Sequence, residues 1–394
     1  MMRAPDVVVA GLGAHGAALV HELARRGVSV LGLDMHTPPH EYGSTTGRTR
    51  ITRQAYYEDP LYVPLVQRAG ELWAEIEELT GTVLYRQTGG LMAGRADCEL
   101  VRGCLASAER HGLPHEVLGA DGIRRRFQVL QPDDDVVGVY EPNAGVLLLD
   151  ACIRTLLEQA VAYGAEIRTG TRVTGWRANG AGVTLETTSG SVHAGHAVFA
   201  VGSWLNPLLA SEQGDAPVQL QLTIERQTAH WFGAAPGVHG FSAAECPVTM
   251  LALADGRMLY TLPDVGHGLK AALHHDGATV TADTVDRTVG SAEEERVRAL
   301  LQDWMPGAGH RVLDGGVCLY TNTPDRHFVV DRHPSHGNVL LVSACSGHGF
   351  KFATALAEVT ADLALEGDAA FDVAMFAVDR VLASQPAPPS SSHG

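Results

Sequence analysis

The sequence predicts a two-domain protein in which an α/β domain built on a parallel sheet is interleaved with a mostly antiparallel sheet domain. Three observations support this fold class. The chain has 394 residues, more than one simple core usually holds. A strand, a glycine turn, a helix and a second strand follow one another from Asp6 to Asp34. Near residue 200 a buried strand again opens into a glycine turn, which indicates that the first domain is discontinuous.

The first segment has the pattern of a nucleotide-binding unit. Asp6 to Ala10 reads as a strand, Gly11, Gly13 and Gly16 form a G-x-G-x-x-G turn, and the second strand ends in Asp34. Gly11 allows the sharp turn, Gly13 lets the backbone approach a pyrophosphate, and Gly16 lets helix and strand pack closely. The helix N-terminus would face the phosphates, and Asp34 would accept a hydrogen bond from the ribose. The unit is therefore expected to bind the ADP half of a dinucleotide, with FAD and NAD both open.

The rest of the chain reads as alternating helices and strands. Apolar residues at helical spacing predict helices over residues 62–79, 96–111, 118–127, 150–163, 292–304 and 351–365. Apolar and β-branched runs predict strands over residues 83–86, 89–92, 136–149, 166–168, 173–177, 183–187, 192–194, 196–200, 328–331 and 339–343. Arg50 and Arg53 are three residues apart, so they would share a face on a short helical turn.

These segments predict the domain boundaries. A discontinuous nucleotide-binding domain would comprise residues 1–85, 150–215 and 322–383, and a substrate domain would comprise residues 86–149 and 216–321. Residues 384–394 form a low-complexity tail, which we expect to be disordered.

Composition excludes several classes of function. The net charge of −16 is spread along the chain and disfavours nucleic acid or an anionic membrane as a partner. The apolar runs are too short to span a bilayer, and no secretory signal is visible, so we expect a cytoplasmic protein. The six cysteines contain no C-x-x-C pair, so they are expected to be reduced.

Two motifs late in the chain hold residues that could carry chemistry. The first runs from Cys318 to His327, and the second, Ser346 to Lys351, precedes the last predicted helix. A Ser-Gly-His-Gly turn before a helix offers backbone N–H groups and the positive end of a helix dipole. Such a terminus can stabilise negative charge on a ligand. The same pattern also fits an ordinary helix start, so the residues alone leave both interpretations open.

These motifs and several others, in the same order, resemble the monomeric sarcosine oxidase family, which includes N-methyltryptophan oxidase and related amine-oxidising flavoproteins. The matching segments are Gly11–Gly16, Thr49–Tyr56, Asn143–Leu147, Gly268–Lys270 with His274, Cys318–Asp325 and Ser346–Phe352. The similarity runs from Asp6 to Arg380. It implies FAD as the cofactor and a glutathione-reductase-like FAD-binding domain with an interleaved antiparallel substrate domain.

The resemblance implies that the FAD is covalently attached at Cys318, through sulfur to the 8α-methyl carbon. Attachment needs a thiolate, so a cationic neighbourhood should depress the pKa of Cys318. The other five cysteines are interpreted as small buried hydrophobes. Gly347, Gly349 and Phe350 are implied to contact the cofactor.

The resemblance also implies a carboxylate clamp for an amino-acid substrate. Arg53 offers a planar fork to the carboxylate, and Lys351 adds a point charge beside it.

Five further residues match active-site positions of the family. Lys270 corresponds to a lysine near flavin N5, where a cation assists the reduction of oxygen. His274, Tyr260 and His348 match other active-site positions, His348 beside the flavin. Arg50 is expected to pack at the flavin face.

The resemblance therefore implies oxidation of a secondary amine, an N-methyl or cyclic amino acid, to an imine, with reduction of O2 to H2O2. The partners would be a small amine or amino acid and O2, and we expect a monomer. No metal is expected, because His327, His333 and His336 are irregularly spaced.

Three alternatives stay open. A dehydrogenase using another electron acceptor could dispense with Lys270. A biosynthetic flavoenzyme could oxidise a bulkier or aromatic-forming amine, since the segment around Tyr260 differs from the sarcosine enzymes and Cys345 stands where an aromatic residue is expected. A nucleotide-binding regulator would have no use for Cys318 or for the pair of Arg53 and Lys351.

Overall fold

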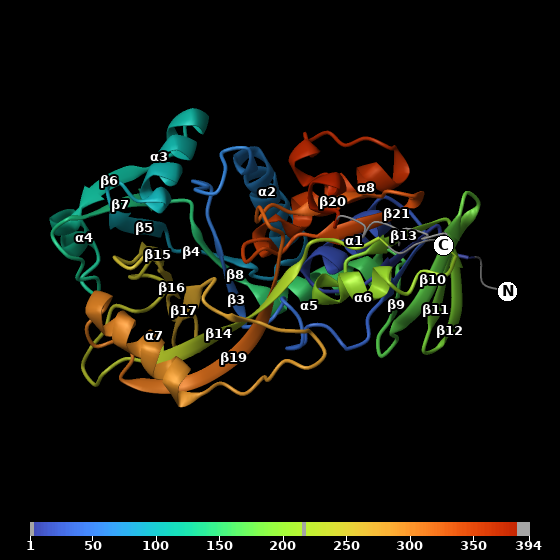
Figure 1. Cartoon of the computed structure of the whole chain (residues 1–394). Coiled ribbons are helices and arrows are strands. Elements are labelled where there is room, and N and C mark those ends of the chain that lie inside the picture. The colour runs from blue at the N-terminus through green and yellow to red at the C-terminus, as the bar shows by residue number, and fades with distance from the viewer. Residues whose placement is uncertain (1–3, 215–217, 384–394) are drawn as a thin grey trace, which may run out of the picture.

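The computed structural model describes residues 4–214 and 218–383. Two large sheets lie in opposite halves of the molecule in Figure 1, the parallel one in the right half and the antiparallel one in the left half. The predicted tail, 384–394, lies outside the described residues.

In the described part of the chain, the parallel sheet has six strands in the order β20-β21-β13-β1-β2-β9. They are β1 (Val7–Ala10), β2 (Val30–Leu33), β9 (Glu166–Arg168), β13 (His196–Phe199), β20 (Val329–His333) and β21 (His336–Ser343). Only β20 is antiparallel to its neighbour. These strands come from three separate stretches of chain.

Both faces of this sheet are covered, which is why its strands are apolar at successive positions. Val7 and Val9 face a helical layer, and Val8 and Ala10 face the opposite layer. The helical layer consists of α1 (Ala14–Arg25), α2 (Tyr62–Thr80), α5 (Leu149–Ala162) and α8 (Ala353–Leu365). The opposite layer consists of a three-stranded sheet, β10 (Val173–Asn179), β11 (Gly182–Thr187) and β12 (Gly190–Ala194), with α6 (Leu205–Leu209).

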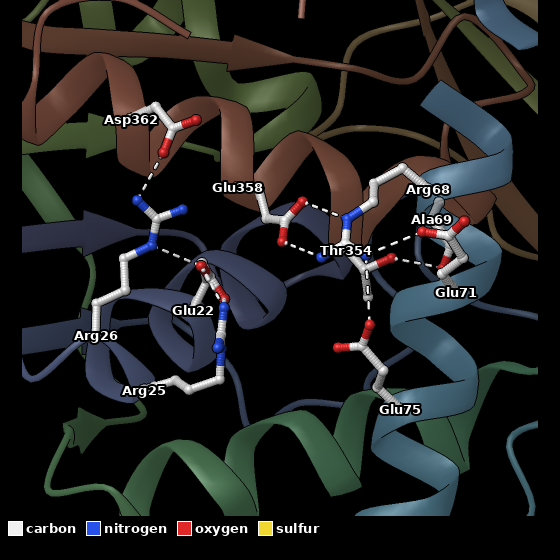
Figure 2. Close-up of polar contacts among 10 residues, drawn as sticks. All are labelled: Glu22, Arg25, Arg26, Arg68, Ala69, Glu71, Glu75, Thr354, Glu358 and Asp362. Atoms are coloured by element: carbon white, nitrogen blue, oxygen red, sulfur yellow. Dashed lines mark hydrogen bonds and ion pairs between the residues drawn. The ribbon is translucent and has the colours of Figure 1, made fainter. Parts of the chain in front are cut away.

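Charged side chains tie α8 to its two neighbouring helices, as Figure 2 shows. Arg68 of α2 donates to both carboxylate oxygens of Glu358 on α8, at 2.9 and 2.8 Å. Arg26, at the end of α1, bonds Asp362 on α8 at 2.6 Å and Glu22 at the same distance. These contacts fix α8 against α1 and α2, and α8 directly follows the Ser346–Lys351 motif.

The second large sheet contains nine strands within the described residues, and most neighbours are antiparallel. They are β5 (Gly90–Arg95), β6 (Glu116–Gly119), β7 (Val136–Glu141), β14 (Thr223–Gly233), β15 (Val248–Ala252), β16 (Met258–Leu262), β17 (Leu269–His274), β18 (Ala278–Thr279) and β19 (Arg311–Asn322). One face packs on α7 (Ser291–Trp304), and α3 (Glu99–His111) and α4 (Ala120–Arg126) lie against β5, β6 and β7.

Strand alternation decides which residues of this sheet reach the interior between the two sheets. On β17, Leu269, Ala271 and Leu273 pack in the core beneath α7. Lys270 and His274 point to the other face because successive side chains of a strand alternate. The residues at 270 and 274 therefore project from one strand into the same space.

The helical turn expected at Arg50 and Arg53 is wrong. Residues Thr49–Thr52 form strand β3, which pairs with β8 (Gly145–Leu148), itself paired with β4 (Tyr85–Gln87). After β3, the carboxylate of Glu141 accepts hydrogen bonds from the N–H groups of Gln54 and Ala55. Pairing with distant residues thus holds this segment extended.

The other predicted elements are present with shifts of a few residues at their ends. Short 3-10 turns complete the chain: η1 (Gly202–Trp204), η2 (Phe350–Phe352), η3 (Ala374–Phe376) and η4 (Val378–Val381). Among the residues described, no helix combines the length and the apolar character needed to cross a membrane.

Candidate active site

A cavity of about 690 Å³ runs between the two sheets. Of the residues predicted to form the site, all except Gly16 line this cavity. Its volume lies within the usual range of ligand sites, roughly 300–1,000 Å³. Residues predicted from far-apart motifs therefore meet in one space.

The glycine turn forms one end of the cavity. Gly11 has φ +89°, and a Cβ there would lie 2.5 Å from the carbonyl oxygen of Ala200. A Cβ on Gly16 would lie 1.8 Å from the carbonyl oxygen of Gly11, so this glycine is needed for close packing of α1 on β1. Asp34 accepts hydrogen bonds from the N–H groups of Leu12 (2.8 Å) and His36 (2.7 Å). Asp34 thus also braces the turn itself.

The cavity wall fits a long polar ligand such as FAD. Four side chains that line it carry a buried polar atom without a hydrogen-bond partner among residues 4–214 and 218–383. They are His15, Ser44, Thr49 and Ser343. Buried polar groups are normally satisfied, so these atoms are available to a bound molecule.

Cys318 lies on β19 opposite Gln227 of β14 and lines the cavity. The predicted cationic neighbourhood is present, since Arg50 and Lys270 both act to lower the thiol's pKa. The net effect is nevertheless opposite to the prediction: burial raises the pKa of Cys318 because removing a thiolate from water costs more than these cations return.

Arg53 and Lys351 lie close together, in a buried cluster. The Nη2 atom of Arg53 donates to both oxygens of Glu58, at 2.7 and 2.6 Å, and its guanidinium stacks over the ring of Tyr56. Burial opposes the charge of Arg53, but Glu58 overcomes this and raises the pKa of Arg53. The fork expected to bind a ligand carboxylate is therefore already engaged by a carboxylate of the protein.

Lys351 completes this cluster. Its Nζ donates to the carbonyl oxygen of His348 at 2.7 Å and lies 3.4 Å from the hydroxyl of Tyr56. Burial and the neighbouring Arg53 lower the pKa of Lys351 to about 7. His348 shares a 2.6 Å hydrogen bond with Tyr56, and burial lowers the pKa of His348 to about 3, so this imidazole is neutral.

Lys270 occupies a second cationic cluster in the same cavity. Its Nζ donates to the carbonyl oxygens of Gly47 (2.8 Å) and Thr49 (3.0 Å). Burial and the nearby Arg50 hold the pKa of Lys270 well below its ordinary value. The sequence contains only two lysines, Lys270 and Lys351, and both are buried in this cavity.

Aromatic and imidazole rings surround His274. Its Nδ1 lies 3.3 Å from the hydroxyl of Tyr320, and its ring meets that of Tyr260 edge to face. Burial, with His275 close by, holds the pKa of His274 well below its ordinary value, and burial raises the pKa of Tyr260 to about 12. A Cβ on Gly347 would lie 2.7 Å from the Tyr320 ring, so only glycine fits beside this cluster.

The helix expected to start at Lys351 begins slightly later. Residues 350–352 form the 3-10 turn η2, and α8 starts at Ala353. Phe350 lies beneath the guanidinium of Arg50 at 5.9 Å, and a Cβ on Gly349 would lie 1.7 Å from the carbonyl oxygen of Ala344. The motif is thus a tight turn that packs against the end of β21.

Sequence reasoning missed Glu58, Tyr56, Trp231 and Arg48 as parts of the site. Glu58 and Tyr56 stand next to a recognised motif, so an acid five residues after Arg53 was the available signal. Trp231 offered none, because its proximity to Lys270 comes from pairing of β14 with β17.

The three histidines considered for a metal are not brought together. His327 bonds the hydroxyl of Tyr62, whereas His333 and His336 stack on each other beside Trp176.

Comparison with known proteins identifies the family of this chain. The family model described as FAD dependent oxidoreductase matches residues 6–363. Monomeric sarcosine oxidase of Streptomyces avermitilis is 40% identical over 96% of this chain and 98% of that protein. N-methyl-L-tryptophan oxidase of Yersinia pestis is 32% identical over 95% of this chain and 99% of that protein. The structure of NikD, an amino acid oxidase essential for nikkomycin biosynthesis, superimposes with a TM-score of 0.85, 24% identity and coverage of 97% and 99%. The chain therefore belongs to the family of FAD-dependent oxidoreductases, and within it to the amine oxidases related to monomeric sarcosine oxidase.

Proposed function

We propose that this enzyme oxidises a secondary amino acid, N-methylated or cyclic, to an imine and reduces O2 to H2O2. The observation that carries the proposal is the presence of two pairs of basic side chains in one cavity, Arg53 with Lys351 and Lys270 with Arg50. When bound, FAD would accept a hydride from the carbon next to nitrogen and return two electrons to O2, which takes up two protons.

Arg53 and Lys351 would hold the substrate carboxylate. Because Glu58 already occupies the fork of Arg53, the incoming carboxylate must share or displace that contact. The surrounding cations also favour loss of a proton from the bound amine, and the neutral amine is the form that can lose hydride. His274 and His348 are neutral, so they add no charge that would oppose a cationic product.

In its ammonium form, Lys270 would supply positive charge where oxygen is reduced, which favours an oxidase over a dehydrogenase. We expect Lys270→Met to slow reoxidation of the reduced enzyme by oxygen at least tenfold while amine oxidation under anaerobic conditions continues. Stopped-flow absorbance of the two half-reactions separates these effects. Equal rates of reoxidation in both proteins would remove this role from Lys270.

Covalent attachment of FAD at Cys318 is the second part of the proposal. The purified protein should be yellow, and the colour should stay with the pellet after acid precipitation. Cys318→Ser should release it to the supernatant, while Cys345→Ser, the matched control in the same cavity, should not. Colour in the wild-type supernatant would refute attachment, and a colourless protein would refute FAD as the cofactor.

A bulkier amine is the second candidate substrate. Cys345 is a small side chain in the cavity wall beside Thr321 and Leu319, where the resemblance leads us to expect an aromatic one. Peroxide formation measured over N-methyl, cyclic and aromatic amino acids decides between the candidates. Cys345→Phe should lower kcat/KM for a bulky substrate and leave that for the smallest substrate within about threefold.

We propose a glutathione-reductase-like FAD-binding domain and a substrate domain with the boundaries predicted from the sequence. We also propose a monomer that acts in the cytoplasm. Light scattering coupled to size-exclusion chromatography tests whether the protein is a monomer, and cell fractionation tests its location.

A further inference from the structure

Three side chains form a row across neighbouring strands beside the cavity. Asp314 of β19 is in register with Trp231 of β14, and Trp231 is in register with Lys270 of β17. Cross-strand partners point to the same face of a sheet and interact. The Nζ atom of Lys270 lies 5.3 Å from the centroid of the Trp231 ring.

Arg48 lies over this row. Its guanidinium forms an ion pair with Asp314 and stands 4.9 Å from the centroid of the same Trp231 ring. Its backbone has φ +63°, a left-handed conformation that is costly for a residue with a side chain, and its carbonyl accepts a hydrogen bond from Leu149. Strained residues of this kind cluster at functional sites.

The ion pair of Arg48 and Asp314 is partly exposed to solvent, whereas the lysine beside it is buried. The side chains of Arg48 and Asp314 are 33% and 43% exposed, whereas Lys270 is 3% exposed. Distances of 4.9 and 5.3 Å to one ring centroid bound the separation of the two cations at about 10 Å, one Debye length at 0.1 M salt. The charge of Arg48 therefore reaches Lys270.

Other charged or titratable groups also face Lys270. Arg50 acts on it from β3, Cys318 from β19, and the carbonyls of Gly47 and Thr49 bind its Nζ. Tyr260 on β16 and His274 on β17 share its face of the sheet. Of the charged groups, only Arg48 has its own carboxylate partner in the row, so its effect can be changed in either direction.

We propose that Arg48 and Asp314 form a positioning pair that sets the charge state of Lys270 and hence the pH range in which the enzyme reacts with oxygen. Arg48 disfavours the ammonium form of Lys270, and Asp314 offsets part of that effect. The predicted change in the pH range of the reaction with oxygen rests on the proposed function, but the predicted change in the charge state of Lys270 does not.

The signs of two substitutions distinguish this proposal from a structural ion pair. Arg48→Gln removes a positive charge, so the pH at which Lys270 loses its proton should rise. Asp314→Asn leaves Arg48 unneutralised, so the same midpoint should fall. A pair that only anchors the loop would be broken by either substitution, and both would then shift the midpoint in the same direction.

The lysine content of the chain makes the measurement direct. Holoenzyme labelled with ε-13C-lysine should give two lysine side-chain signals, which Lys351→Met assigns. We expect midpoint shifts of Lys270 of about half a pH unit, upward in Arg48→Gln and downward in Asp314→Asn. Shifts of the same sign, a shift in one variant alone, or no shift in either would overturn the proposal.

Controls keep the result interpretable. Asp314→Glu retains the charge and should restore the wild-type midpoint of Lys270. The comparison of Asp314→Asn with Asp314→Glu can be made even if Arg48→Gln does not fold. Asp135→Asn breaks an exposed pair with Arg95 outside the cavity and should leave Lys270 unchanged. The pH profile of reoxidation by oxygen should move with the midpoint. If Lys270→Met does not alter reoxidation, the proposed function fails while the NMR shifts still decide this inference.

Discussion

Lys351 lines the cavity, and its charge changes near neutral pH. Its ordinary pKa of 10.5 is lowered to about 7 by burial and by Arg53. A bound carboxylate favours the ammonium form, so affinity for a carboxylate should be greatest below pH 7 and fall as the pH rises through 7. His348 and His274 have pKa values below this range and do not change charge there.

Acetate has no amino group, so its binding reports the titration of the protein without that of an amine substrate. The dissociation constant of acetate, read from the perturbation of the visible spectrum, should rise up to tenfold per pH unit above pH 7. In Lys351→Met it should be nearly independent of pH between 6 and 9. The same slope in both proteins would assign the titration to another group.

Glu58 forms an ion pair with the buried Arg53. This pair stabilises the fold, but it also competes with a ligand carboxylate for Arg53. Arg53 is 2% exposed, and in the absence of a ligand carboxylate Glu58 is its acidic partner. Glu58→Gln should cost roughly 3–5 kcal/mol of unfolding free energy, because a buried cation is left uncompensated. The same variant should bind acetate about tenfold more tightly, since the guanidinium is freed.

Thermal melts with and without acetate test both the predicted loss of stability and the predicted gain in acetate affinity. The Glu58→Gln melting temperature should start lower and rise more with acetate than that of the wild type. A variant that is destabilised yet binds acetate no better would show that Glu58 does not compete for Arg53.

At the scale of elements, α8 is positioned by charges that lie outside the cavity. Arg68 makes a two-pronged contact with Glu358 on α8 and single contacts with Glu71 and Glu75 on its own helix (Figure 2). Glu358 is 16% exposed and Glu71 63% exposed. The contact between helices should therefore be worth more than the one within α2.

Glu358→Gln is expected to lower the free energy of unfolding by about 1 kcal/mol, and less in 1 M salt, because partly exposed ion pairs are screened. Glu71→Gln removes another carboxylate that contacts Arg68. This substitution should change the free energy of unfolding by no more than about 0.3 kcal/mol. Urea denaturation of both variants checks this, and equal losses would show that α8 does not depend on the bridge.

Elements governed by local pattern could be predicted, and those governed by distant pairing could not. The helix over 62–79 and the strands around the glycine turn follow from periodicity and were confirmed. The segment with Arg50 and Arg53 was wrong, because its partners, β8 and Glu141, lie about ninety residues away. Charge spacing alone carried no information about those partners.

At the scale of the whole molecule, the residues of the recognised motifs were predictable, but Glu58, Trp231, Arg48 and the energetics of the cavity were not. Motifs identified Cys318, yet its raised pKa depends on how much water the folded chain excludes. The contact of Arg48 and Lys270 with one tryptophan likewise depends on the register of three strands. Sequence patterns indicate which residue types gather, and the three-dimensional packing sets their charge.

The burial of both lysines has a consequence for the life of the protein in a cell. Acylation, glycation and the attachment of peptide tags to lysine need an accessible ε-amino group. The folded enzyme presents none, and its basic surface consists of arginine and histidine. A peptide tag on a lysine of this protein, which is too large to enter the cavity, would therefore record that a molecule had opened.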